Sequence, residues 1–137
     1  MALRIDLRDG ESVVVNGAVL CASGRARILV QNRVTILRGT EIMLPEQATT
    51  PARRLYFACM MAYLEPEVEA YRDDVLSLYE AIFDTFVGEE AKLSCGKLAT
   101  FMATGDFFRA LGVCRELIEY EDGILERMES AGAQAAA

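Results

Sequence analysis

The residues best suited to chemistry in the first half of this chain are its arginines. Residues 1–63 contain eight arginines, no lysine and five acidic residues, which gives a net charge of +3. An arginine guanidinium forms two parallel hydrogen bonds with a phosphate or carboxylate and stacks on planar rings, whereas a lysine offers only a point charge. This composition therefore favours specific anion contacts. If the anion is RNA, the candidate binding residues are Arg25, Arg27, Arg38, Arg53 and Arg54.

Catalytic and metal-binding chemistry have little support in the sequence. The chain contains no histidine, the commonest general base and a frequent zinc ligand. Its four cysteines are widely separated, form no CxxC pair and are interpreted as buried small hydrophobes: Cys21, Cys59, Cys95 and Cys114. Acid pairs such as Asp73-Asp74 are adjacent, so they diverge on a helix. We predict that the chain is not an enzyme and binds no metal or other cofactor.

The charge is divided unevenly along the chain and leaves two function classes open. Residues 64–137 hold six basic and sixteen acidic residues, a net charge of −10, and the whole chain has a net charge of −7. One class is a nucleic-acid regulator that uses the arginine-bearing half, for which single-stranded RNA is the better target because +3 is small for duplex binding. The other is a protein–protein module. A regulator should gather arginines on one sheet face, and a chaperone should expose an apolar groove between helices.

No segment of the sequence predicts export or membrane insertion. Charged residues interrupt every apolar stretch in the first thirty positions, so no signal peptide is expected. The longest nearly uncharged apolar run, residues 55–64, is about half of what a membrane-spanning helix needs. We therefore expect a soluble, cytoplasmic protein without a membrane partner.

The first forty residues predict a meander of about five short antiparallel strands. Asn16-Gly17 favours a two-residue hairpin loop that places Val15 opposite Ala18 and Val13 opposite Leu20. A second hairpin is predicted around Gln31-Asn32, between residues 28–30 and 34–37. That register puts Arg25 opposite Arg38, with Arg27 on the same face. The alternative, three solvated arginines at a sheet margin, remains open.

The hairpin of residues 12–21 is apolar on both of its faces. A sheet with one wet face does not fit this pattern. The second face must be covered by helices of the same chain or by another copy of the protein. We therefore predict a homo-oligomer that associates through the sheet.

Helices are predicted for the rest of the chain. Thr50-Pro51 is typical of a helix start, although residues 52–64 could also form a buried strand. Further helices are expected from Pro66 to about 87, from 89 to 103 and from Asp106 onward. The predicted fold class is α+β in a single domain, 1–137. Its parts are a β-sheet lobe (1–44), a connector (45–51), a helical lobe (52–129) with three or four packed helices, and a frayed tail (130–137).

The connector and the start of the first helix carry a long block that resembles one protein family. Ile42-Met43, Pro45-Glu46 and the run from Thr49 to Phe57 resemble the flagellar biosynthesis repressor family FlbT. The opening is also similar, with Asp9-Gly10-Glu11, Asn16-Gly17-Ala18 and Gln31-Asn32-Arg33. The resemblance covers essentially the whole chain, and the tail after residue 129 is its least similar part.

The resemblance implies post-transcriptional control of flagellin synthesis. Such proteins associate with the 5′ untranslated region of flagellin messenger RNA, where they restrain translation and hasten decay until the hook and basal body are complete. In some bacteria the family acts positively. The implied partners are the flagellin leader RNA and, among proteins, the regulator FlaF or flagellin. The alternative is an adaptor or chaperone-like module that acts through its helical half without touching RNA.

Overall fold

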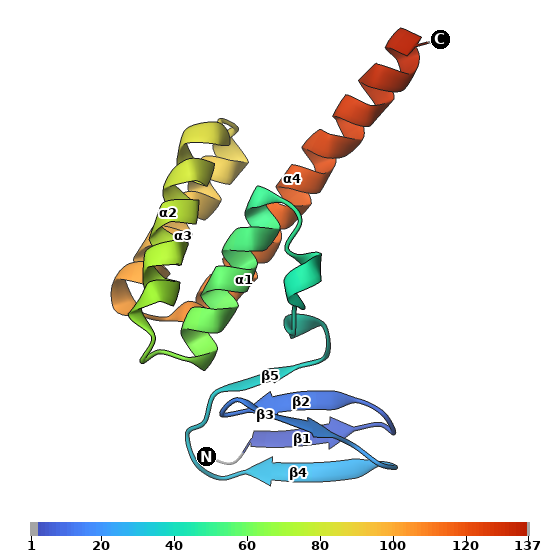
Figure 1. Cartoon of the computed structure of the whole chain (residues 1–137), viewed down its shortest axis with the longest axis vertical. Coiled ribbons are helices and arrows are strands. Elements are labelled where there is room, and N and C mark those ends of the chain that lie inside the picture. The colour runs from blue at the N-terminus through green and yellow to red at the C-terminus, as the bar shows by residue number, and fades with distance from the viewer. Residues whose placement is uncertain (1–2, 137) are drawn as a thin grey trace. The chain divides into compact units, whose positions relative to one another are not determined.

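The computed structural model describes residues 3–136, which divide after Met43 into two compact units. The first, here called the β unit, contains all five strands, and the second, the helical unit, contains all four α-helices of the described chain (Figure 1). This confirms the predicted α+β class, with five short antiparallel strands followed by four helices.

Two small antiparallel sheets make up the β unit. Strand β1 (Leu3–Leu7) pairs with β4 (Ala26–Val30). Strand β2 (Ser12–Val15) lies between β3 (Ala18–Cys21) and β5 (Ile36–Arg38). The four residues Ile5, Leu7, Val13 and Ala22 form the buried cluster, against which further partly buried aliphatic residues pack.

The β2–β3 hairpin has the predicted register. Val15 lies opposite Ala18 and Val13 opposite Leu20. Asn16 and Gly17 have φ values of 48° and 83°, and only residues that tolerate positive φ can form this two-residue turn. The side chain of Asn16 also accepts a hydrogen bond from the backbone N–H of Thr35, at 3.0 Å, which brings β5 alongside β2.

The predicted hairpin around Gln31-Asn32 is wrong. Strand β4 pairs along its full length with β1, and β5 pairs with β2, so residues 31–35 connect two different sheets. Arg38 consequently lies opposite Val13 and not opposite Arg25. The physical reason is that each strand finds a hydrogen-bonding partner distant in sequence, and those contacts outweigh a weak turn signal between neighbours.

The helical unit contains α1 (Pro51–Leu64), α2 (Glu69–Thr85), α3 (Glu89–Thr104) and α4 (Phe107–Ala136). Two single-turn 3₁₀ helices, Gly39–Glu41 and Pro45–Gln47, precede them. Helix α1 packs against α2 and α4, and α3 packs against α4. Figure 1 shows the C-terminal part of α4 extending beyond the other three helices. No helix within residues 3–136 has an apolar stretch long enough to cross a lipid bilayer.

Local capping chemistry explains where these helices begin and end. The Thr50 side chain accepts a hydrogen bond from the backbone N–H of Arg53, with Pro51 in the first turn, so residues 51–64 form the helix and not the alternative strand. Asp106 accepts one from the backbone N–H of Arg109 at the start of α4. Gly105 ends α3 with φ of +73°, a conformation that glycine adopts without steric cost. Helix α2 begins at Glu69, three residues after the predicted start.

Candidate nucleic-acid interface

Four arginines of the β unit line one broad, open cleft. Its volume is about 890 Å³, and its charged lining residues are Asp6, Arg8, Asp9, Glu11, Arg25, Arg27 and Arg38. Three of these arginines, Arg25, Arg27 and Arg38, were predicted from the sequence to share a face. The cleft brings them together even though the register used to predict this was wrong for β5.

The strand pairing accounts for the position of each cleft arginine. Arg27 lies on β4 opposite Asp6 of β1, and its Nε is 3.0 Å from an Asp6 carboxylate oxygen. Arg25 directly precedes β4, and Arg8 directly follows β1. Because β1 and β4 are antiparallel, the C-terminal end of β1 lies beside the N-terminal end of β4, and Arg8 and Arg25 are at the same end of the sheet. Arg38 is the last residue of β5.

The three carboxylates of the cleft are engaged in local contacts. Asp9 accepts a hydrogen bond from the backbone N–H of Gly24, and Glu11 accepts one from that of Arg8, both at 2.7 Å. Asp6 is paired with Arg27 and, at 3.5 Å, with Arg4. Among residues 3–136 no carboxylate forms an ion pair with Arg8, Arg25 or Arg38. Their guanidinium groups are therefore available for an anionic ligand.

Arg8 is a cleft residue that the sequence analysis missed. It directly follows β1, and only the pairing of β1 with β4 brings it near Arg25. The sequence also has no aromatic residue before Tyr56. Any base that stacked in this cleft would have to stack on an arginine guanidinium plane.

Arg53 lies in the helical unit and is held by an internal ion pair. Its two terminal nitrogens are 2.8 and 2.9 Å from the two carboxylate oxygens of Asp122 on α4. This bidentate hydrogen bonding raises the pKa of Arg53 and lowers that of Asp122. Glu121, whose side chain is buried, accepts a 2.9 Å hydrogen bond from the backbone N–H of Ala52. Together these contacts join the start of α1 to the middle of α4.

Arg54, the neighbour of Arg53 on α1, is exposed. It lines a separate groove between α1 and α2, with Phe57, Met61 and Leu78 forming apolar parts of the lining. The volume of this groove is about 350 Å³. An apolar groove between helices is the feature expected of the alternative, adaptor-like class.

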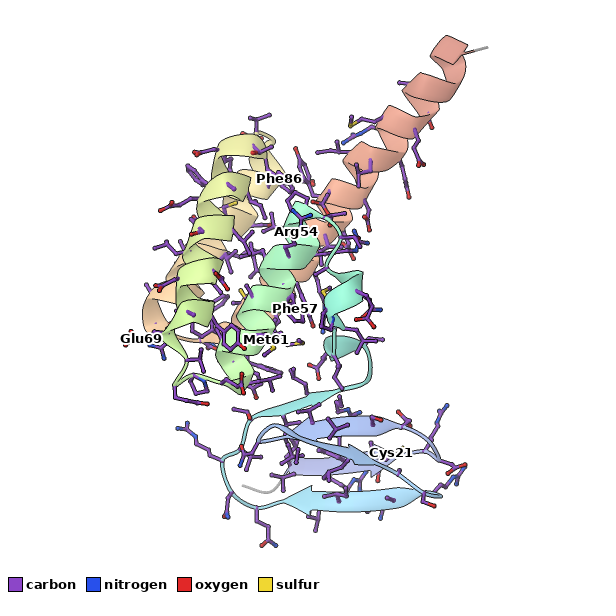
Figure 2. All side chains as sticks on the ribbon, in the orientation of Figure 1. Cys21, Arg54, Phe57, Met61, Glu69 and Phe86 are labelled. Carbon is purple, nitrogen blue, oxygen red and sulfur yellow. The ribbon has the colours of Figure 1, made fainter. Side chains whose placement is uncertain are left out.

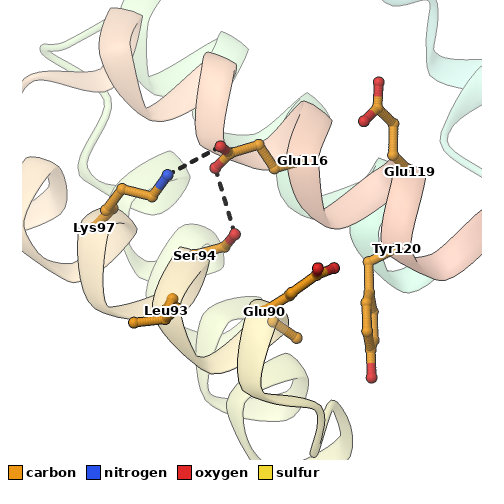
Figure 3. A pocket seen from close by; sticks show the side chains of 8 residues that line it. Glu90, Leu93, Ser94, Lys97, Glu116, Glu119 and Tyr120 are labelled. Carbon is orange, nitrogen blue, oxygen red and sulfur yellow. Dashed lines mark hydrogen bonds and ion pairs between the residues drawn. The ribbon is translucent and has the colours of Figure 1, made fainter.

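A third pocket, of about 440 Å³, lies between α3 and α4 (Figure 3). Glu116 of α4 accepts a hydrogen bond from the Ser94 hydroxyl at 3.3 Å and is ion-paired with Lys97 at 2.9 Å. Glu116 therefore links two side chains of α3 to α4. Ser94 donates its hydrogen bond to the Glu116 carboxylate, which is also paired with Lys97. We interpret this group of contacts as a structural link between α3 and α4.

The cysteine prediction is right for three residues and wrong for one. Cys59, Cys95 and Cys114 are buried, but Cys21 is exposed on β3. The thiol of Cys114 donates to Cys59 across 3.8 Å, and this hydrogen bond together with burial raises its pKa well above the usual value. Within the described part of the chain, no three cysteine, aspartate or glutamate side chains are placed to hold a metal ion.

Comparison with known proteins gives a family match over most of the chain. Residues 3–125 match the family described as flagellar protein FlbT. The chain is 35% identical over 132 residues to the "Flagellum biosynthesis repressor protein FlbT" of Caulobacter vibrioides, covering 95% of this chain and 94% of that protein. It is 36% identical over 124 residues to a "Probable flagellum biosynthesis repressor protein FlbT" of Caulobacter sp. strain K31, covering 89% and 95%.

A third relative, from Rhizobium etli strain CFN 42, carries the same "probable" name and is 34% identical over 128 residues, covering 93% of this chain and 86% of its own length. These relatives are named as repressors and not as enzymes, in agreement with the prediction that the chain is not an enzyme. No solved structure matches the chain. The family match and the long alignments show that this chain belongs to the FlbT family of flagellar proteins.

Proposed function

We propose that this chain regulates flagellar synthesis after transcription, by binding RNA through the cleft of the β unit. The coarser part, a regulatory role, follows the names of its relatives, which are flagellum biosynthesis repressors. The finer part is association with the 5′ untranslated region of flagellin messenger RNA, where the protein represses translation or promotes decay and so couples flagellin synthesis to assembly. A protein that acts on translation works in the cytoplasm.

The observation that supports RNA binding is the set of unneutralised arginines in one cleft. Arg8, Arg25 and Arg38 lie around it and form no ion pair with a carboxylate of residues 3–136, and Arg27 is paired with the exposed Asp6. Guanidinium groups bind phosphate oxygens and the O6 and N7 atoms of guanine in pairs of hydrogen bonds. Three or four such contacts suit a short stretch of RNA better than a long duplex. Arg53 and Arg54 stay predictions as RNA contacts, and the proposal does not depend on them.

Reversing the charge of a cleft arginine is expected to weaken RNA binding. Arg25→Glu or Arg27→Glu should cost roughly 1–3 kcal/mol, up to about a hundredfold in affinity for a flagellin leader RNA measured by fluorescence anisotropy. The slope of log affinity against log salt should become shallower by roughly 0.7–1 for each lost phosphate contact.

Arg33→Glu is the matched control, because Arg33 is an exposed arginine of the same unit that does not line the cleft. Arg33→Glu should lower the affinity for RNA only slightly, because it weakens only the long-range electrostatic attraction. If Arg8, Arg25, Arg27 and Arg38 can each be reversed with no more effect than Arg33, direct recognition through the β unit is wrong.

Self-association through the β unit is part of the proposal. Strand β3 is at the edge of its sheet, and its residues are all exposed, with Val19 71% and Leu20 44% accessible. An uncharged apolar edge strand is a ready partner for another strand. We expect a dimer by light scattering at tens of micromolar, and Val19→Lys should shift it toward monomer. A monomeric wild-type protein at that concentration would exclude this arrangement.

The second candidate function is an adaptor that binds a flagellar protein, such as FlaF or flagellin, through its helical unit. The observation that favours it is the apolar groove between α1 and α2. The two functions use different units, so one protein could carry both.

A further inference from the structure

The groove between α1 and α2 has the residue spacing of a helix-binding site. Along α1 its lining residues recur at positions 54, 57, 58 and 61, and along α2 at 71, 74 and 78. These are the three- and four-residue steps of a helix face. The apolar side chains among them, Phe57, Met61 and Leu78, are only partly buried. Figure 2 shows Arg54, Phe57 and Met61 along α1.

The α2 side of this groove is acidic. Asp74 lines it, and α2 also carries Glu69, Asp73, Glu80 and Asp84 against the single cation Arg72. The pKa of Tyr71 in the groove lining is raised, by burial first and then by the negative charges of Glu65 and Asp74. The helical unit as a whole, residues 44–137, has seventeen acidic and eight basic residues. The lining of the groove itself holds one acidic and one basic residue, Asp74 and Arg54, so the negative field around its apolar floor comes from the rest of the helical unit.

The charge argues against α2 or the free end of α4 of a second copy as the occupant. The free end of α4 exposes Leu125 and Met128, but Glu126 and Glu129 flank them. The exposed Leu76 and Phe83 belong to acidic α2 itself. Either face would bring like charges together in the groove, which costs binding energy. The partner that fits is a helix with the opposite charge.

We infer that the groove between α1 and α2 binds a basic amphipathic helix of another protein. Apolar side chains spaced at i, i+3 or i+4 and i+7 would contact Phe57, Met61 and Leu78, and flanking lysines or arginines would lie beside Asp74. Arg54, near the start of α1, offers one cation for a carboxylate at a single end of the partner helix. This gives the helix a preferred direction. The inference concerns the helical unit and is independent of RNA binding.

The probe for this site is a pair of synthetic helical peptides of about 18 residues, or about five turns. Both carry leucines at helical spacing, and one has lysines where the other has glutamates. The lysine peptide is expected to bind at least about tenfold more tightly, a difference of about 1.4 kcal/mol. With methyl-labelled methionine, its addition should shift the NMR signal of Met61 and leave that of Met128, on the free part of α4, in place.

Two variants test the apolar floor and the charge separately. Phe57→Ser should weaken the lysine peptide about tenfold or more, whereas Phe83→Ser, at an exposed phenylalanine outside the groove, should not. Asp74→Lys should narrow the preference between the two peptides, and because Asp74 is exposed this change should leave the fold intact. Affinity for the leader RNA should change no more in these three variants than in Arg33→Glu, which separates this test from that of the β-unit cleft.

Two results would overturn the inference. One is equal affinity for the lysine and glutamate peptides. The other is lysine-peptide binding that survives Phe57→Ser and leaves the Met61 signal unmoved, since that pattern reports only diffuse attraction to acidic helices.

Discussion

Arg53→Met is expected to lower the free energy of unfolding by about 3 kcal/mol, whereas Arg54→Met should change it by less than about 0.5 kcal/mol. The two neighbours differ in what they contact. Arg53 holds Asp122 by two hydrogen bonds and lies 3.6 Å from a buried oxygen of Glu121, for which the described residues provide no hydrogen-bond donor. Without Arg53, that buried carboxylate loses its nearest positive charge.

Urea denaturation of the two variants measures this difference. A second measurement follows from the lowered pKa of Asp122, whose main cause is the hydrogen bonding to Arg53. A carboxylate with a lowered folded-state pKa stabilises the fold above its ordinary pKa, and this stability is lost as the pH falls through the lowered value. Below about pH 4 the free energy of unfolding of the wild type should therefore fall toward that of Arg53→Met, which lacks this ion pair at every pH. If Arg53→Met and Arg54→Met lower the free energy of unfolding equally, the ion-pair cluster does not stabilise the fold.

Ile5→Ala is expected to unfold the β unit while the helices remain. Ile5 is 1% exposed and belongs to a cluster with three other buried residues, Leu7, Val13 and Ala22. Removing so large a buried side chain costs about 2–5 kcal/mol. A unit of this size, at about 0.05–0.15 kcal/mol per residue, has a total stability of only about 2–6 kcal/mol. The loss is therefore comparable to the whole stability of the unit.

NMR spectra should show the amide signals of residues 3–43 collapsing, while far-ultraviolet circular dichroism keeps its helical signal. Because the arginine cleft belongs to the β unit, Ile5→Ala should also lose affinity for the leader RNA. Leu98→Ala, a deletion of similar size in the core of the helical unit, is the matched control and should weaken the helical signal instead. Joint collapse of both units in Ile5→Ala would mean that the chain is one cooperative domain, as the sequence alone predicts.

Features set by neighbouring residues could be predicted from the sequence, and distant pairings could not. Asn16-Gly17 determines the β2–β3 register because few residues tolerate its backbone angles, and Thr50-Pro51 begins α1 through one local hydrogen bond. The pairing of β1 with β4 has no comparable local signal. Gln31-Asn32 is a weaker turn signal than Asn16-Gly17, and the hairpin predicted from it does not form because β4 and β5 pair with distant strands.

The same distinction applies to the candidate sites. Arg25 and Arg27 could be grouped because alternation along one strand is local. Arg38 is grouped with them through a hairpin that does not form, and Arg8 joins them only through the β1–β4 pairing. Arg53 and Arg54 are predicted together as RNA contacts from their place at the connector. The partner of Arg53, Asp122, is 69 residues away, so no local pattern in the sequence predicts their ion pair. Nor does composition separate the exposed Cys21 from three buried cysteines.

The contacts between the start of α1 and the middle of α4 also set an order for folding during synthesis. The β unit is complete once about one third of the chain has been made, and its strands can pair as they leave the ribosome. Ala52 and Arg53 must wait for Glu121 and Asp122, their partners 69 residues later, which enter the chain several seconds later at about 5–20 residues per second. During that interval α1 has α2 to pack against but lacks the anchor for its first turn. A nascent chain of this protein would therefore present a folded arginine cleft well before its helical unit can close.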